Sequence, residues 1–495
     1  MAREEARARR EAAMTEYEIV IGLEVHAQLL TVSKMFCGCS TVFGGEPNTR
    51  TCPVCQGMPG SLPVINRRAV EFGIKTALAL GCRVNVLNRF ARKHYYYPDM
   101  PKNYQISQYE EPLAEHGSLE IEVDGALRAI GIQRVHLEED VGKLIHEGNL
   151  ETALSSQVDF NRAGVPLMEI VSKPDMRNSA EAAAYLRGLR AILVYLGVCD
   201  GNMEEGSLRC DANISLRPKG EQEFGTKVEI KNMNSFRNVQ HALDYESRRQ
   251  ARTLEDGGRI SQETRLWDPD RAQTVSMRSK EYAHDYRYFP EPDLPPLQLE
   301  PRWVDEIHAT LPELPAARRH RFARQYELSP YDADLLAQGR GLADYFEEVV
   351  RVHPKPKVVA NWVLNELLRE VQGDDDKALA ACPIPPRHLA GLLALIDDGT
   401  ISGKIAKDVF EKMYRSGEEA QAIVAREGLR QVADTGAVAV VVDQVLSAHP
   451  KVVDDWKSGK KAAMGFLVGQ VMKATGGRAN PALVNSVLSE KLSRL

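Results

Sequence analysis

The stretch that decides the fold spans residues 202–215 and reads Asn-Met-Glu-Glu-Gly-Ser-Leu-Arg-Cys-Asp-Ala-Asn-Ile-Ser. Asn202 and Gly206 indicate a turn, and the alternation of apolar and polar residues from Leu208 onward predicts a strand. One face of this strand then carries a cation, a carboxylate, an amide and a hydroxyl, which belong to Arg209, Asp211, Asn213 and Ser215. A cleft-lining strand that binds a metal ion and a phosphate has this pattern, and so does a solvated edge strand.

A second polar face occurs near the N-terminus, where residues 17–30 predict a strand. Glu24 and His26 lie on the side opposite Leu23 and Val25. A glutamate and a histidine two residues apart on a strand can bind one cation together, and a half-exposed strand is the alternative. The repetition of such faces along the chain favours a site.

Two further stretches show the same pattern. In residues 135–143, His136, Glu138 and Asp140 alternate with Glu139 on the opposite side. Carboxylates this close repel one another unless cations offset them, and magnesium takes oxygen ligands. An acidic surface strand is the alternative.

The remaining polar face belongs to residues 225–237, where Lys227, Glu229 and Lys231 alternate with apolar residues and Thr226. A helix is predicted from about Ser235. Lysines on a strand that leads into a helix N-terminus suit a phosphate group.

Four of the eight cysteines are clustered with the spacing C-x-C-x12-C-x2-C, and they are Cys37, Cys39, Cys52 and Cys55. Four thiolates at such spacing predict a tetrahedral zinc site. A closed site of this kind has no open position for a substrate, so its predicted role is structural. Eight cysteines in 495 residues do not make a disulfide scaffold, which indicates a reducing, cytoplasmic compartment.

An aromatic and basic segment covers residues 90–105. Its tyrosines, Tyr95, Tyr96 and Tyr97, lie close to Lys102 in sequence and could stack on a base or sugar while cations hold phosphate. A tyrosine-rich loop packed over the edge of a core is the alternative. No GxxxxGK[ST] loop and no GxSxG motif occurs, so ATP would have to bind in an unusual, metal-lined sheet.

The charge is distributed unevenly. The net charge is −6, yet residues 451–495 contain eight Lys or Arg against three Asp or Glu. A basic terminal module on an acidic body suits a polyanionic partner, and a solvated helical face is the alternative. No apolar run reaches about 18 residues, so no membrane span is predicted.

The predicted fold class is α+β, in four segments. Residues 1–15 form a flexible extension without a secretory pattern, and 16–297 form a cradle around an antiparallel sheet with the zinc knuckle at 37–55. A proline-rich linker ends this part. Residues 298–425 form an all-α domain, and 426–495 form a small basic helical tail.

Together these stretches resemble the GatB/GatE family, the GatB members of which belong to aspartyl/glutamyl-tRNA(Asn/Gln) amidotransferases. The resemblance rests on Ile21 to His26, the four cysteines, and the segments 90–105, 136–142, 159–172, 203–215, 227–237 and 286–297. These segments follow the family's order over most of the first 297 residues.

The resemblance implies a glutamine-hydrolysing carbon–nitrogen ligase. The family phosphorylates the side-chain carboxylate of Glu-tRNA(Gln) or Asp-tRNA(Asn) with ATP and magnesium, and ammonia then displaces the phosphate. GatA supplies the ammonia and GatC completes a heterotrimer. The helical and tail domains bind tRNA, largely by its shape, and the cognate non-discriminating synthetase is a further partner. A non-catalytic tRNA-binding scaffold is the alternative.

The predicted roles follow from this chemistry. The catalytic residues are Glu24, His26, Glu138, Glu139, Arg209 and Lys231. The magnesium ligands are drawn from Glu24, His26, Glu138, Glu139, Glu205, Asp211 and Glu229. The residues that hold ATP or the tRNA end are Lys227, Lys231, Arg209, Tyr95, Tyr96, Tyr97 and Lys102.

Overall fold

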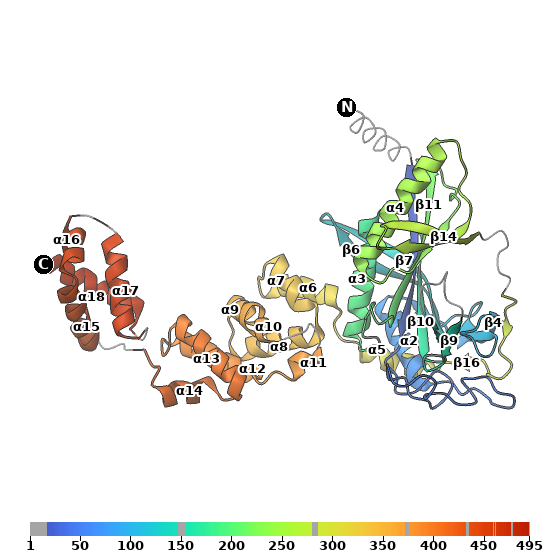
Figure 1. Cartoon of the computed structure of the whole chain (residues 1–495). Helices are drawn as coiled ribbons and strands as arrows, with labels where there is room; N and C mark the ends of the chain where they lie inside the picture. Colours follow the sequence, from blue (N-terminus) through green and yellow to red (C-terminus); the bar gives the residue numbers. More distant parts are fainter. Residues whose placement is uncertain are drawn as a thin grey trace. The chain divides into compact units, whose positions relative to one another are not determined.

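The structure is a computed structural model, and it describes residues 17–146, 155–279, 286–371, 376–431, 435–458, 460, 462–476 and 479–494. The predicted extension, residues 1–15, lies outside the described residues. The chain divides into two compact units between Leu314 and Pro315. The first unit is built on a sheet and the second is helical, which confirms the predicted α+β class (Figure 1).

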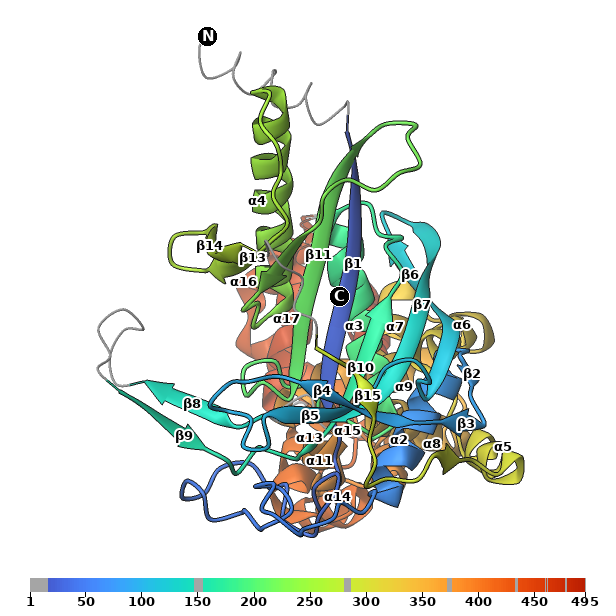
Figure 2. The ribbon, with the colours of Figure 1, turned by 90° about the vertical axis from the view of Figure 1, so that its right-hand side faces the viewer.

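The first unit is organised around one sheet of 12 strands. These strands are β1 (Tyr17–Gln28), β2 (Arg83–Val84), β4 (Phe90–His94), β5 (Tyr104–Gln108), β6 (Ala114–Val123), β7 (Ala126–Glu139), β10 (Pro166–Ser172), β11 (Leu208–Pro218), β12 (Val228–Lys231), β13 (Glu263–Asp268), β14 (Gln273–Ser279) and β15 (Phe289–Pro290). The main path runs β14-β13-β12-β11-β1-β10-β7-β5-β4-β15, while β6 pairs with β7 and β2 with β6. Figure 2 shows β1 between β11 and β10.

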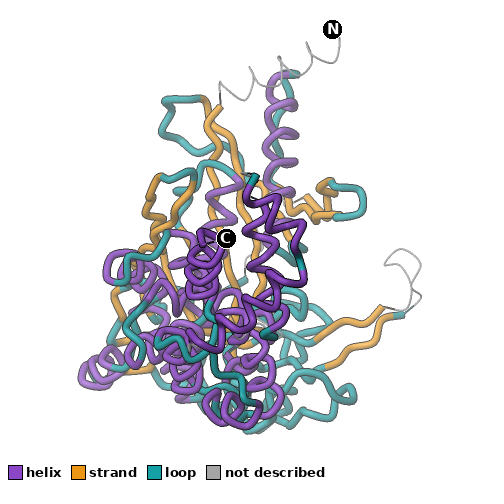
Figure 3. Tube along the Cα trace, turned by 90° about the vertical axis from the view of Figure 1, so that its left-hand side faces the viewer, coloured by secondary structure: helices purple, strands orange, loops and turns teal. Residues whose placement is uncertain are grey.

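One pairing departs from the predicted antiparallel sheet. Strands β12 and β13 are parallel, because helix α4 (Phe236–Glu255) makes the crossover between them. Two small sheets stand apart from the main one: β3 (Leu87–Asn88) pairs with β16 (Leu297–Gln298), and β8 (Lys143–His146) pairs with β9 (Ser156–Asp159). The β8–β9 hairpin projects from the unit in Figures 2 and 3.

The main sheet has an apolar face and a polar face. The side chains of Leu23, Val25 and Ala27 are buried on the apolar face, within one core that includes residues of α2 (Arg67–Ala79), α3 (Ser179–Tyr195) and α4. Because side chains alternate along a strand, the intervening polar residues of β1 face the other way. The helices therefore cover the apolar face of the sheet, and the side chains of the polar face are the candidates for binding and catalysis.

The core of the first unit continues past the predicted domain boundary at residue 297. Helix α5 (Pro301–Ala309) follows the proline-rich segment, yet Ile307 is buried in the same core as the sheet. Leu299 and Leu314 pack there as well. The compact unit that contains the sheet thus extends to Leu314.

The second unit consists of helices with two separate apolar cores. The helices around the first core are α6 (Pro315–Gln325), α7 (Pro330–Ala337), α8 (Arg340–Val352), α9 (Pro356–Trp362), the π-helix η1 (Val363–Leu367), α10 (Leu368–Glu370), α11 (Asp376–Ala380), α12 (Pro386–Asp397), α13 (Gly403–Ser416) and α14 (Ala420–Glu427). The helices around the second core are α15 (Thr435–Ala448), α16 (Pro450–Lys457), α17 (Ala462–Ala474) and α18 (Pro481–Arg494).

Among the described residues, no single helix is long and apolar enough to cross a membrane. One pair, α15 and α16, has the length and composition of a span when the two helices are taken together, with a bend of 91° between them.

Candidate metal centre on the polar face of the sheet

Strand register brings the predicted polar residues into rows across the sheet. His26 on β1 stands opposite Glu169 on β10 and opposite Arg209 on β11. Glu169 in turn stands opposite His136 on β7. Since directly opposite residues point to the same face, these four side chains share the polar face.

A neighbouring row lies further along the same face. Glu24 on β1 stands opposite Asp211 on β11. The Asn213 amide donates to the Glu24 carboxylate at 2.9 Å, and Glu229 stands opposite Asn213. Lys231 bonds the Asp211 carboxylate and lies 3.2 Å from that of Glu229.

The tightest group on this face consists of His26, Glu138 and Glu169. Their ligand atoms all lie within 4.8 Å of one another, and both glutamates are buried. The His26 Nε2 atom lies 3.3 Å from Glu169 Oε2. His136 adds a second imidazole, with its Nε2 atom 3.5 Å from Glu169 and 3.8 Å from Glu138.

The electrostatics of this group suit a cation. Burial works against protonation of His136, but Glu169 and Glu138 outweigh this effect and raise its pKa to about 9. Burial, followed by the charge of Glu169, raises the pKa of Glu24. Three carboxylates thus influence one small, buried region, and a bound cation would relieve their repulsion.

The two predicted phosphate-binding cations on this face are already held by carboxylates. The Arg209 guanidinium donates to Asp140 at 2.8 Å, and the Gln28 amide donates to the same carboxylate at 2.7 Å. Lys231 is held by Asp211 and Glu229 in the same way. These ion pairs fix the direction of both cations, and neither cation is a free surface charge.

Glu139 was predicted to bind magnesium together with Glu138. The structure corrects this prediction, because the two side chains do not lie together. Adjacent residues of a strand point to opposite faces, so Glu139 projects behind the sheet. There it bonds the Lys102 ammonium and accepts from the Ile106 amide at 2.9 Å. The pair lines a cavity of about 200 Å³ beside the cysteine cluster.

Other predicted site residues are also placed apart. Glu205 is exposed in the turn before β11, and Lys227 is exposed just before β12. Tyr96 and Tyr97 are 71% and 47% exposed, and Tyr95 lies against Tyr97 with a ring-centroid distance of 5.8 Å. Of the predicted magnesium ligands, Glu205 does not belong to the group of potential metal ligands found among the described residues.

Four residues near the cluster were absent from the predicted site. They are Lys93, His136, Asp140 and Glu169. His136 and Asp140 alternate with Glu138, which was a usable signal. Glu169 lies among apolar residues in β10, and only its opposition to His26 and His136 reveals its place.

The four cysteines come together as predicted. Their Sγ atoms all lie within 4.8 Å of one another, and the Cys52–Cys55 separation is 3.9 Å. Sulfurs of a tetrahedral zinc site lie about 3.8 Å apart, given a Zn–S length of about 2.3 Å. Burial raises the pKa of the Cys55 thiol, but a hydrogen bond with Cys37 has a larger, opposite effect. Together with the charge of Lys34, this bond lowers the pKa of Cys55 to about 4. The residues fit a structural zinc ion.

The polar-face cluster fits a different kind of ion. Two carboxylates and one imidazole provide hard oxygen ligands and one nitrogen, and they leave positions for water or phosphate oxygens. Magnesium or manganese fits this donor set.

The fold and the two clusters define the class of protein: an α+β chain with a group of potential metal ligands on the polar face of its sheet and a cluster of four cysteines. Comparison with known proteins makes this more specific. A family model described as the GatB/GatE catalytic domain matches residues 19–305, and one described as the GatB domain matches residues 344–492. The chain belongs to the GatB/GatE family.

Several relatives are similar over nearly their whole length, and each is named as the B component of an aspartyl/glutamyl-tRNA(Asn/Gln) amidotransferase. The chain is 60% identical to the protein of this name from Carboxydothermus hydrogenoformans, over 97% of this chain and 100% of the relative. It is 59% identical to the one from Moorella thermoacetica, over 96% and 100%. The corresponding protein of Syntrophotalea carbinolica is 55% identical over 97% and 99%.

Proposed function

We propose that the chain is the GatB component of an aspartyl/glutamyl-tRNA(Asn/Gln) amidotransferase, the enzyme for which its relatives are named. In this proposal it phosphorylates the side-chain carboxylate of Glu-tRNA(Gln) or Asp-tRNA(Asn) with ATP. Ammonia then replaces the phosphate and leaves the amide. One observation carries the proposal. His26, Glu138 and Glu169 lie together on the polar face of the sheet, within the residues that the GatB/GatE catalytic-domain model matches.

The reaction brings two anions together, because a carboxylate must attack the γ-phosphate of ATP. Charge must therefore be neutralised and both groups must be aligned. His26, Glu138 and Glu169 would hold magnesium, and magnesium when bound neutralises phosphate charge and orients the oxygens. The charge of Glu169 influences the carboxyl group of Glu24. Glu24 would therefore be a further ligand of the ion, or it would hold one of the ligands in place.

The cations of the face would then act on the phosphates. Lys231 is anchored by Asp211 and Glu229, and Arg209 is anchored by Asp140. An anchored cation loses little conformational entropy when an anion arrives, so it stabilises developing charge without reorganising. In this proposal both residues contact ATP or the developing acyl phosphate.

The rest of the chain would serve the complex. We propose that a GatA protein hydrolyses glutamine and supplies ammonia, that a GatC protein completes the trimer, and that the complex acts in the cytoplasm. The basic tail around α15 to α18 would bind tRNA through its phosphates. Zinc in the four-cysteine knuckle would fix the loops between β1 and α2.

The test is to change the cluster in the reconstituted complex. Glu138→Gln and Glu169→Gln should each lower ATP-dependent phosphorylation of the misacylated tRNA by more than about 100-fold. Even the outer partners of metal ligands cost about 10- to 100-fold. Binding of tRNA and hydrolysis of glutamine should persist. Glu120→Gln is the matched control, because Glu120 is exposed on β6.

The alternative function has a clear signature in the same experiment. Unchanged phosphorylation in both cluster variants would mean that the carboxylates are structural. The chain would then be a tRNA-binding scaffold, and the catalytic centre would lie elsewhere in the complex. Purified complex should also be offered each misacylated tRNA separately, since this measurement identifies whether glutamine, asparagine or both are made.

A further inference from the structure

A short segment of chain forms the edge of the main sheet next to β4. This strap, residues 286–291, includes β15 and pairs with β4. The backbone amide of His94 donates to the carbonyl of Tyr286 at 2.9 Å. The strap is therefore attached to β4 at the level of the residue next to Lys93.

A buried ion pair holds the other end of the strap. Glu291 is 2% exposed, and its carboxylate receives two bonds from the Arg92 guanidinium, at 2.8 and 2.9 Å. Bidentate pairs of this kind are geometrically strict. The Arg92 group also lies over the ring of Tyr104, with 4.3 Å to its centroid. Both ends of the strap are thus fixed to β4.

The strap places the ring of Tyr286 against Lys93. The Lys93 ammonium lies 5.1 Å from the centroid of this ring, within the range of a cation–π contact. Burial works against the charge of Lys93, but Glu138, Tyr288, Glu169 and Tyr286 together outweigh burial and raise its pKa. Lys93 is therefore a charged group whose charge is stabilised by two cluster carboxylates.

Lys93 nevertheless does not bond either carboxylate. Within the described part of the chain it forms no ion pair, although both carboxylates influence its charge. A flexible ammonium whose charge is stabilised by two buried carboxylates would otherwise be expected to pair with one of them. The ring of Tyr286 provides a competing place for the charge, and the attached strap keeps that ring in position.

We propose that Tyr286 holds the Lys93 ammonium away from Glu138 and Glu169 and so keeps these carboxylates available to a divalent cation. Without the ring, the ammonium would move onto the carboxylates and compete with the metal ion for the same oxygens. Tyr286 is then a positioning residue that acts through Lys93. The inference rests on the proposed function, because it takes the cluster to be the metal site.

The experiment measures Mn²⁺ binding to the full chain by electron paramagnetic resonance, without ATP or tRNA. Tyr286→Leu removes the ring and should weaken Mn²⁺ binding about ten-fold, a change that equals about 1.4 kcal/mol. Tyr286→Phe keeps the ring and should bind within about three-fold of the unchanged chain, since phenylalanine offers the same face to a cation.

A double variant separates this explanation from a general disturbance of the strap. In Lys93→Met the competing charge is gone, so Mn²⁺ should bind at least as tightly as to the unchanged chain. Adding Tyr286→Leu to Lys93→Met should then change the affinity by less than about two-fold. An equal loss in both backgrounds would overturn the inference, as would unchanged binding in Tyr286→Leu alone.

The metal site itself is tested by a further variant. Glu138→Gln should reduce Mn²⁺ binding in the unchanged background. If it does not, the proposed metal site fails and the inference fails with it. If Glu138→Gln reduces binding but Tyr286→Leu does not, only the inference is refuted.

Discussion

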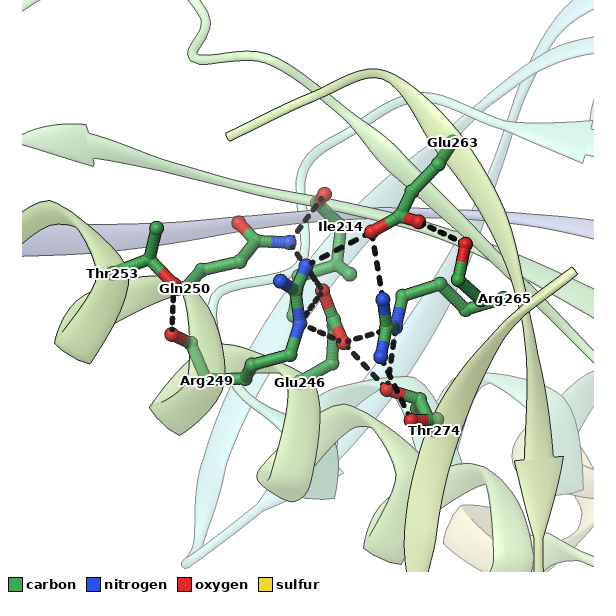
Figure 4. Close-up of polar contacts among 9 residues, drawn as sticks. Ile214, Glu246, Arg249, Gln250, Thr253, Glu263, Arg265 and Thr274 are labelled. Carbon is green, nitrogen blue, oxygen red and sulfur yellow. Dashed lines mark hydrogen bonds and ion pairs between the residues drawn. The ribbon is translucent and has the colours of Figure 1, made fainter. Parts of the chain in front are cut away.

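A buried ion cluster between α4 and the β13–β14 hairpin makes a sharp stability prediction (Figure 4). Glu246 is fully buried, and its carboxylate accepts bonds from Arg249 at 2.6 to 3.1 Å, Gln250 at 3.0 Å and Thr274 at 2.9 Å. Arg265 lies 3.5 Å away and completes the cluster. Glu263 pairs with the same two arginines, at 3.6 Å from Arg249 and 2.7 Å from Arg265. Two carboxylates thus face two guanidinium groups.

The perturbation is Glu246→Ala. The change leaves two guanidinium groups facing one carboxylate, that of Glu263, and removing one partner from a buried ion pair costs about 3–5 kcal/mol. In a unit of this size 1 kcal/mol corresponds to roughly 2–4 °C in Tm, so Tm should fall by about 6–20 °C. Glu246→Gln keeps the shape and most hydrogen bonds, and it should cost about half as much.

Differential scanning calorimetry of the full chain measures this effect on the transition of the sheet unit. Glu306→Ala is the matched control, because Glu306 forms an exposed helical pair with Arg302 at 2.9 Å. Such a pair contributes less than about 1 kcal/mol. Equal Tm values for Glu246→Ala and Glu306→Ala would refute the reasoning. The free-energy cost of removing these charged groups from water would then equal the gain from their attraction, and the cluster would contribute no net stability.

The cluster also bears on the site. It attaches β13 to α4, and the Thr264 hydroxyl on β13 donates to Glu229 at 2.7 Å. Glu229 in turn holds Lys231. Loss of Glu246 should therefore loosen the edge of the polar face, and amide hydrogen exchange in β12 and β13 should rise in the variant.

Three further predictions concern other parts of the chain. The arginine partners of Glu347 outweigh burial and lower its pKa to about 2, from an ordinary value of 4.5. Glu347→Gln should therefore destabilise the helical unit by roughly 1–3 kcal/mol at pH 7, and the difference from the unchanged chain in urea melts should disappear as pH falls from 4.5 to 2. One zinc ion per chain should be found by elemental analysis, lost in Cys52→Ser and retained in Cys82→Ser. Deletion of residues 451–495 should weaken tRNA binding with a reduced salt dependence and leave glutamine hydrolysis intact, and an unchanged salt slope would exclude the tail as the phosphate-binding part.

Local patterns were sufficient for the two faces of the strands and for the cysteine cluster. The side-chain period of a strand is two residues, so the sequence around Glu24 and Asp211 already separates apolar from polar positions. The four cysteines lie within 19 residues of one another, so short loops bring them together without help from the rest of the fold. The family follows from the same stretches, because their order and spacing are a property of the chain alone.

Only the tertiary structure decided which polar residues meet. Glu169 reaches His26 through the register of β10, and Tyr286 reaches Lys93 through a strap that returns to β4 from 193 residues further along the chain. Glu139 is lost from the cluster because successive residues of a strand point to opposite faces, and Glu138 takes the polar one. Register between distant strands is set by the burial of all the apolar side chains together, and no short stretch of sequence contains that information.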